Sequence, residues 1–150
     1  MATYSLTQEE AEYLLNMLKK SLEAVVKFPN LGNKAKFNVE GFESSELFKI
    51  QIYRGSKNPK KYNIGALILR YNVPLLELHI NPTNVHQNPD GSKIVGSHWH
   101  VYSEKYGRGE AVPAEDIDSE AFVENTLAFL EKFNVVEKPE IELDKNQNLF

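Results

Sequence analysis

The order of hydrophobic and polar positions divides the chain into a helix, a group of strands and a second helix. Thr7-Gln8-Glu9-Glu10 has the form of a capping box, in which a hydroxyl and a carboxylate satisfy the free backbone N–H groups of a new helix. Apolar residues then recur at helical spacing as far as Val26, until Pro29 and Gly32 interrupt the pattern. The pattern predicts an amphipathic N-terminal helix.

From residue 34 to residue 80 the apolar period changes to two, which is typical of half-buried strands. The apolar stretches are separated by short turn signals rich in Gly, Pro, Asn and Ser, at 41–44, 55–59 and 72–74. Connections this short join antiparallel strands, whereas parallel strands need a long crossover. We therefore expect an antiparallel meander.

A second amphipathic helix follows, and Ser119 can cap its start. Its apolar stripe consists of Phe122, Thr126, Phe129, Leu130 and Phe133. Residues 139–143 predict an edge strand, and residues 144–150 a frayed tail. The fold expected is α+β, a single domain over residues 1–150 with a four- or five-stranded antiparallel sheet flanked by an N-terminal and a C-terminal helix.

Composition narrows the possible chemistry. The chain has 150 residues, 41% of them hydrophobic, which is enough for a core, and it has no cysteine. Disulfides and thiolate ligands are therefore excluded, and a metal site must use His, Asp, Glu or carbonyl oxygen. No stretch has the length and apolarity of a membrane span or of a signal peptide, so we expect a cytosolic protein without a membrane partner.

The net charge of −4 is unevenly distributed. Residues 1–103 carry a net +3 and residues 104–150 a net −7. This balance gives no reason to expect direct nucleic-acid binding, and the C-terminal acidity indicates either a solvated face or a patch that docks on a basic partner.

All four histidines of the chain fall within residues 79–100. In a strand over 76–80, Leu76 and Leu78 would face the core and His79 the opposite side. In a strand over 98–102, His98 and His100 would share one face, roughly 6.5–7 Å apart along the strand. Two imidazoles placed in this way can bind one ion.

The connection between these strands is rich in turn-forming residues, including Asn88-Pro89-Asp90-Gly91, and can carry His86 over the sheet. Four neutral imidazoles would complete a tetrahedral zinc shell with Zn–N distances near ~2.0–2.1 Å, and three would leave a water position. The sequence therefore predicts one zinc ion bound by four histidines, although imidazole also suits copper, nickel and iron. The predicted ligands are His79, His86, His98 and His100, with Asp90, Glu77 and Glu104 in reserve.

Two motifs in this region carry a family resemblance: His-x-Asn-Pro-Asp-Gly at 86–91 and Gly-x-His-x-His-x-Tyr-x-Glu at 96–104. With them, the stretch from Thr7 to about Val135 resembles a prokaryotic family of unknown function found in mobile elements. His79 departs from that family, which tends to carry aspartate there, and this exchange of one ligand type for another supports a metal role. Gly109-Glu110-Ala111 stands where the family has a tryptophan segment.

The chain also resembles zinc-containing type II-A anti-CRISPR proteins of phages. The resemblance implies that the protein is not an enzyme, that it acts in the host cytoplasm, and that its partner is the RNA-guided effector nuclease of type II systems. Such a basic partner would bind an acidic surface. The residues expected to form that surface are Glu110, Glu115, Asp116, Asp118, Glu120 and Glu124.

Two other functions remain open from the residues. A small zinc-dependent hydrolase would use three histidine ligands and a metal-bound water, with Glu104 or Glu77 as the general base. A metal-stabilised module of the antitoxin kind would use the ion only to hold its fold. The number of protein ligands on the metal separates these alternatives, because a shell closed by four histidines has no open position.

Overall fold

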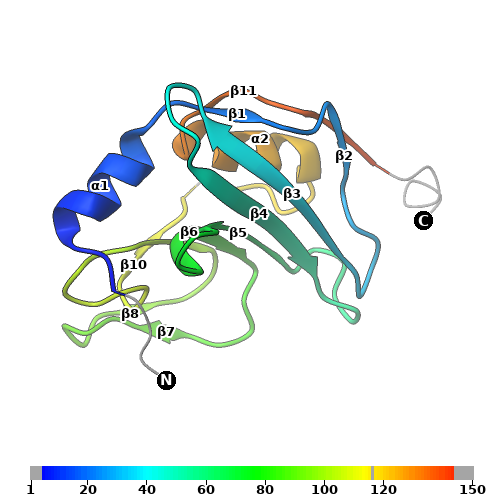
Figure 1. Cartoon of the computed structure of the whole chain (residues 1–150). Helices are drawn as coiled ribbons and strands as arrows, with labels where there is room; N and C mark the ends of the chain where they lie inside the picture. The colour runs from blue at the N-terminus through cyan, green and yellow to red at the C-terminus, as the bar shows by residue number, and fades with distance from the viewer. Residues whose placement is uncertain (1–4, 116, 144–150) are drawn as a thin grey trace.

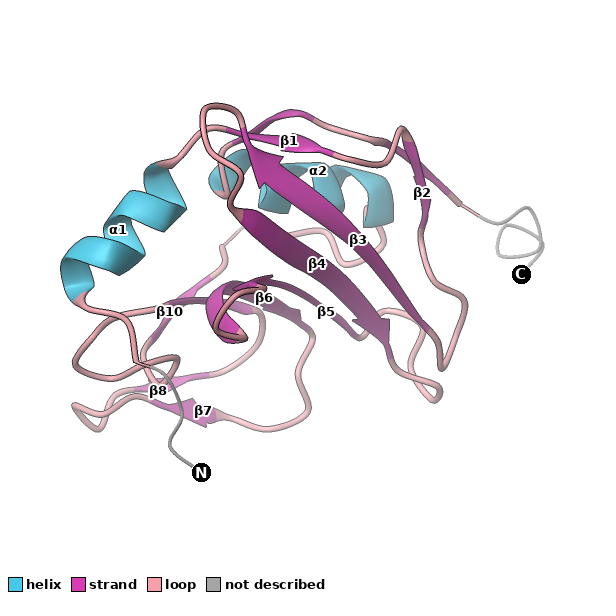
Figure 2. Cartoon of the chain, viewed as in Figure 1, coloured by secondary structure: helices cyan, strands magenta, loops and turns pink. Residues whose placement is uncertain are grey.

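The computed structural model describes residues 5–115 and 117–143 (Figure 1). It contains two α-helices and short to medium strands, which Figure 2 separates by colour. The helices are α1 (Gln8–Asn16) and α2 (Phe122–Lys132). The strands are β1 (Lys19–Ser21), β2 (Val25–Lys27), β3 (Lys34–Gly41), β4 (Leu47–Arg54), β5 (Tyr62–Ile68), β6 (Val73–Ile80), β7 (His86–Gln87), β8 (Lys93–Ile94), β9 (His98–Val101), β10 (Ala111–Pro113), β11 (Val135–Glu137) and β12 (Glu140–Glu142).

The main sheet has eight strands in the order β10-β9-β6-β5-β4-β3-β1-β11. The predicted meander forms its centre, since β3 to β6 pair in sequence and antiparallel. The α+β class is confirmed, but a sheet of four or five strands was too small. The additional strands come from segments whose partners are distant in sequence: β1 pairs with β11 in parallel, and β9 pairs with β6.

The N-terminal helix is shorter than its apolar pattern predicts. Its capping box is present, with the Thr7 hydroxyl accepting from the backbone N–H of Glu10 at 3.0 Å and the Glu10 carboxylate accepting from that of Thr7. The helix ends at Asn16, and Leu18 and Leu22 are about half exposed. Residues 19–27 form β1 and β2 instead, because pairing with β3, β11 and β12 satisfies their backbone groups.

Helix α2 covers one face of the sheet and lies behind β3 and β4 in Figure 1. Its predicted apolar stripe is confirmed: Phe129 stacks on Trp99 of β9 with ring centroids 6.0 Å apart, and Phe133 meets Phe48 of β4 edge to face at 5.3 Å. The predicted cap is wrong. Ala121 occupies the N-cap position without a side-chain cap, and the Ser119 carbonyl oxygen accepts a hydrogen bond from the Tyr62 hydroxyl.

The predicted C-terminal edge strand is present as β12, which pairs with β2 in a separate two-stranded sheet. The predicted tail at 144–150 lies outside the described residues. No helix in the described part of the chain is long and apolar enough to cross a membrane.

Lys19 is fully buried at the junction of α1, β1 and α2. Its Nζ donates to the carbonyl oxygens of Leu15, Met17 and Phe133 at 3.1, 2.8 and 2.9 Å, and lies 4.0 Å from the centroid of the Phe133 ring. These carbonyls end both helices, where backbone acceptors have no helical partner. Lys19 therefore satisfies the ends of two elements that are distant in sequence.

We expect Lys19→Met to lower the free energy of unfolding by about 3 kcal/mol, because buried carbonyl oxygens would lose their donor. Lys20→Met is the matched control. Lys20 lies in the same strand, is partly exposed, and forms a 3.9 Å ion pair with Glu40 and a contact with the Phe42 ring at 5.7 Å, so its loss should cost less than about 1 kcal/mol. Urea denaturation at neutral pH measures both, and equal effects of the two substitutions would contradict the role of Lys19.

The same residue predicts a pH dependence. Burial lowers the pKa of Lys19 to about 7, from its ordinary 10.5. Between these two values the unfolded chain binds one more proton at this site than the folded chain, so the free energy of unfolding contributed by Lys19 rises with pH. The difference in stability between the wild type and Lys19→Met should therefore be larger at pH 9 than at pH 7, as measured by urea denaturation at both values. A constant difference would contradict the lowered pKa.

Candidate metal centre

The pairing of β6 with β9 brings three histidines together. His79 lies opposite His98, and Glu77 opposite His100, so all four side chains project from the same face of the sheet. On the other face, Leu78 lies opposite Trp99, which packs under α2. The predicted alternation in both strands is therefore confirmed, and the histidine face is set by the burial of the opposite face.

The side chains of His79, His98 and His100 form a compact triad. Their candidate ligand atoms all lie within 4.8 Å of one another. His98 and His100 are buried, with exposures of 2% and 5%, and His79 is half-buried. The triad could hold a metal ion.

His86 reaches the triad from the loop that follows β6, at the start of the small β7–β8 hairpin. Its ring centroid lies 4.8 Å from that of His100 and 5.3 Å from that of His98. Four imidazoles bound tetrahedrally at ~2.0–2.1 Å would place their ring centroids roughly 5 Å apart. The distance of the His86 ring from two members of the triad is that of a fourth ligand, whereas His86 is not in the group whose candidate ligand atoms all lie within 4.8 Å of one another.

A turn and a side-chain amide hold the His86 loop in place. The predicted turn at 88–91 is confirmed, with Gly91 N–H donating to the Asn88 carbonyl at 2.9 Å and Gly91 at φ +92°. The Asn88 side chain pairs with both backbone groups of Ala111 in β10, at 2.8 and 2.9 Å. The hairpin is therefore anchored to the sheet edge beside the triad.

Each of the four rings has one nitrogen directed at an oxygen acceptor. The Nδ1–H groups of His98 and His100 donate to the carbonyl oxygens of Gly96 and Arg108 at 3.0 and 2.7 Å. The Nε2–H of His86 donates to the Gly109 carbonyl and to Asn88 Oδ1, both at 3.0 Å.

The Nε2–H of His79 donates to Glu77 at 3.3 Å. Because these oxygens can only accept, the lone pair remains on Nδ1 of His79 and His86 and on Nε2 of His98 and His100. One lone pair per ring is the form that binds metal.

Two of the rings are held neutral by their surroundings. Burial lowers the pKa of His100 to about 4. Burial likewise lowers the pKa of His98. These imidazoles therefore keep a free lone pair at neutral pH, as a metal ligand must.

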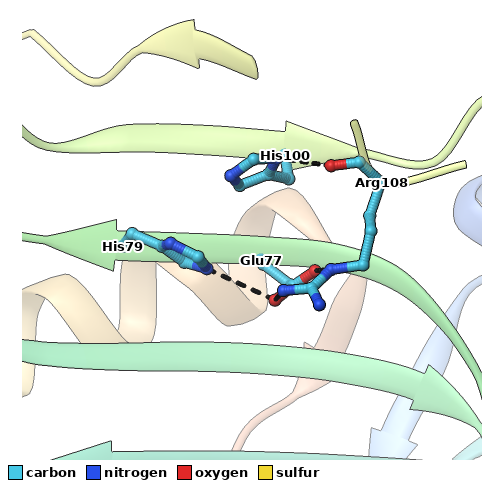
Figure 3. A network of polar contacts seen from close by, with 4 residues as sticks. All are labelled: Glu77, His79, His100 and Arg108. Carbon is cyan, nitrogen blue, oxygen red and sulfur yellow. Dashed lines mark hydrogen bonds and ion pairs between the residues drawn. The ribbon is translucent and has the colours of Figure 1, made fainter. Parts of the chain in front are cut away.

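Glu77 and Arg108 lie beside His79 and His100 on the same face of the sheet (Figure 3). Arg108 binds Glu77 through Nε and Nη2 at 2.6 and 2.5 Å, and its own carbonyl accepts from His100. Burial would raise the pKa of Glu77, but the hydrogen bonds from His79 and Arg108 and the charge of Arg108 outweigh it and lower the pKa to about 2. Glu77 is thus an ionised carboxylate that orients His79.

The other reserve ligands have different partners. The Asp90 carboxylate is exposed and accepts from Ser92 N–H and Oγ within the turn. The Glu104 carboxylate accepts from the backbone N–H of Gln8 at 2.7 Å, at the start of α1. Neither is in the group formed by the triad.

Sequence reasoning missed Arg108, Asn88, and the carbonyls of Gly96 and Gly109. The motifs contain Asn88 and Gly96, but nothing in them indicates contact with a ring. Arg108 lies in a loop, and no sequence pattern marks it as part of the site, because its role depends on a contact with Glu77, 31 residues away. Residues 109–111 supply the acceptor for His86 and the partner for Asn88.

The predicted acidic residues lie along the segment after the metal centre. Among the described residues, Glu110, Glu115, Asp118, Glu120 and Glu124 are exposed, and Asp116 lies outside the described residues. Asp118 accepts from the backbone N–H of Glu120, whose carboxylate forms an ion pair with Lys60 at 2.9 Å. Part of this charge is thus locally balanced.

Comparison with known protein families finds one match, over residues 6–135, to a family of unknown function, DUF6978. The chain belongs to this family. Its match spans α1 to the first residue of β11 and contains all four histidines, so the site described above lies within the family region. No curated protein and no solved structure matches the chain.

We expect Glu77→Gln to weaken metal affinity about 10- to 100-fold without removing any ring, because it removes the charge that orients His79. Glu46→Gln is a matched control, since Glu46 also pairs with an arginine, Arg70 at 2.8 Å, and has the same 15% side-chain exposure. Competition with a chelator of known zinc affinity measures both variants. Equal affinities for Glu77→Gln and wild type would contradict an orienting role.

Proposed function

We propose that the protein is a zinc-binding protein in which His79, His86, His98 and His100 hold one ion that fixes the loop of residues 81–97 to the sheet. The observation that carries the proposal is the state of the four rings. One N–H of each ring donates a hydrogen bond to a fixed oxygen, and the other ring nitrogen retains its lone pair. The centre would therefore be structural and would hold a surface ready for binding.

The spacing of the rings favours zinc. Five of the six pairs have centroids 4.8 to 5.3 Å apart. In a tetrahedral arrangement all six distances between ring centroids are equal. In a square-planar arrangement, which copper(II) and nickel(II) adopt, only four of the six distances are short.

The carboxylates around the centre argue against the hydrolase alternative. A general base must be free to take a proton from the metal-bound water. Glu77 is engaged by Arg108 and His79, and Glu104 by Gln8. The described residues that line the cavity beside the rings include no carboxylate.

We expect purified protein to carry about one zinc per chain, and His98→Ala with His100→Ala to abolish this content and lower the melting temperature. Loop 81–97 should become the first site of proteolysis, because the ion no longer holds it. Elemental analysis, thermal melting and limited proteolysis measure the three effects.

The single variant His86→Ala tests the fourth ligand. X-ray absorption should count four nitrogen ligands in the wild type and three with a water oxygen in the variant. Asn84→Ala, an exposed change in the same loop, should leave zinc content and ligand count unchanged. A wild-type protein without zinc, with a melting temperature that added zinc does not raise, would falsify the proposal.

Inhibition of a type II RNA-guided effector nuclease is a second candidate function, drawn from the resemblance to type II-A anti-CRISPR proteins. Its support is the exposure of Glu110, Glu115, Asp118, Glu120 and Glu124 on the segment that continues from the metal centre. An acidic surface held by a structural ion suits a basic nucleic-acid channel.

If the protein inhibits such a nuclease, reversal of charge at Glu115 and Glu124 should slow association about tenfold at low salt and have less effect at high salt. Glu9→Lys with Glu12→Lys, on the exposed side of α1, is the control and should have little effect. Surface plasmon resonance with the purified nuclease at two salt concentrations measures the rates. Absence of binding at both concentrations would exclude this partner.

A further inference from the structure

We propose that the cavity beside the four histidines binds a small phosphorylated ligand, with its phosphate group next to the zinc. The inference rests on the proposed zinc site. It follows from the charge of that site and from the hydrogen-bond donors around it.

The cavity has a volume of about 470 Å³. This lies within the usual range of small-molecule sites, about 300–1,000 Å³. It is lined by the four histidines together with Lys61, Asn63, Pro82, Thr83, Asn84, Val85 and Arg108. Every lining residue with an ionisable side chain other than histidine is therefore basic.

A zinc ion with four neutral imidazole ligands keeps its whole charge of +2, because no thiolate or carboxylate in its shell cancels it. The charge of Glu77 beside the rings is already balanced by Arg108. Lys61 adds a further positive charge at the cavity wall. Positive charge in a half-buried site attracts an anion strongly, since water screens it only in part.

The wall also carries unused donors. The Nζ of Lys61 donates one hydrogen to Thr83 Oγ1 at 2.5 Å and has two more, and Arg108 uses Nε and Nη2 on Glu77, which leaves Nη1. The side-chain amide of Asn63, which lies directly opposite His79 in the sheet, has no hydrogen bond to another described residue. A phosphate, with several acceptor oxygens and up to two negative charges, matches such a set.

The size and charge of the surroundings favour a small ligand over a nucleic-acid strand. The chain has a net charge of −4, and exposed carboxylates follow the site from Glu110 to Glu124. A long polyanion would be repelled by this segment, whereas a single phosphate would meet only the positive cavity.

Calorimetric titration of the zinc-loaded protein with inorganic phosphate, adenosine monophosphate and a short single-stranded oligonucleotide, at constant ionic strength, tests the inference. We expect saturable binding of phosphate and of the monophosphate, weakened about tenfold by Lys61→Met, since a charge-assisted hydrogen bond is lost. Lys36→Met, an exposed lysine of β3 outside the cavity, should bind as the wild type does. The His98→Ala and His100→Ala double variant should not bind.

Zinc content measured on the same samples separates the two proposals. A wild type that holds zinc but binds neither phosphate nor the monophosphate overturns this inference and leaves the zinc site standing. A wild type without zinc overturns both. Tighter binding of the oligonucleotide than of the monophosphate, or equal losses for Lys61→Met and Lys36→Met, overturns the small-ligand assignment.

Discussion

The antiparallel pairing of β6 with β9 is the constraint on which the candidate centre depends. The register that places His79 opposite His98 also places Leu78 opposite Trp99 under α2. A shift by one residue would bury two histidines beneath the helix and expose the core side chains, at a large cost in apolar burial. The hydrophobic core therefore determines which face carries the histidines, and no metal is needed to select it.

Carbonyl groups in the loops orient the histidine rings that the strands bring together. The carbonyl of Gly96 faces His98 at a φ of +90°, a conformation that favours glycine, and the carbonyl of Arg108 faces His100. The loop from 103 to 110 is itself held to α1 through Glu104 and Gln8. The loop that binds His100 is thus also tied to the N-terminal helix, although that helix contributes no ligand.

Charge divides the surface around the centre into two regions. The cavity beside the rings is lined by Lys61 and Arg108, and the segment from Glu110 to Glu124 is acidic and exposed. The two regions meet at β10, whose Ala111 anchors the His86 hairpin. A metal that holds this hairpin would therefore also position the start of the acidic segment. The proposed structural ion would in this way support both proposed binding surfaces, the cavity and the acidic segment.

The sequence by itself determined the local features. Alternation in 76–80 and 98–101 predicted which histidines share a face, the turn residues at 88–91 predicted the turn before β8, and the apolar stripe of α2 was correct. These properties depend on the period of the backbone and on residues close in sequence, so one segment contains enough information.

Only the tertiary structure decided the rest. The apolar spacing of residues 18–26 suits a helix as well as it suits strands, and the parallel pairing of β1 with β11 resolved it. Arg108 became part of the centre only through contacts with Glu77 and His100. Ser119 is not the N-cap of α2 because Ala121, two residues later, occupies that position. In each case the deciding partner is far away in the chain or belongs to the packed core, and a local pattern contains no information about it.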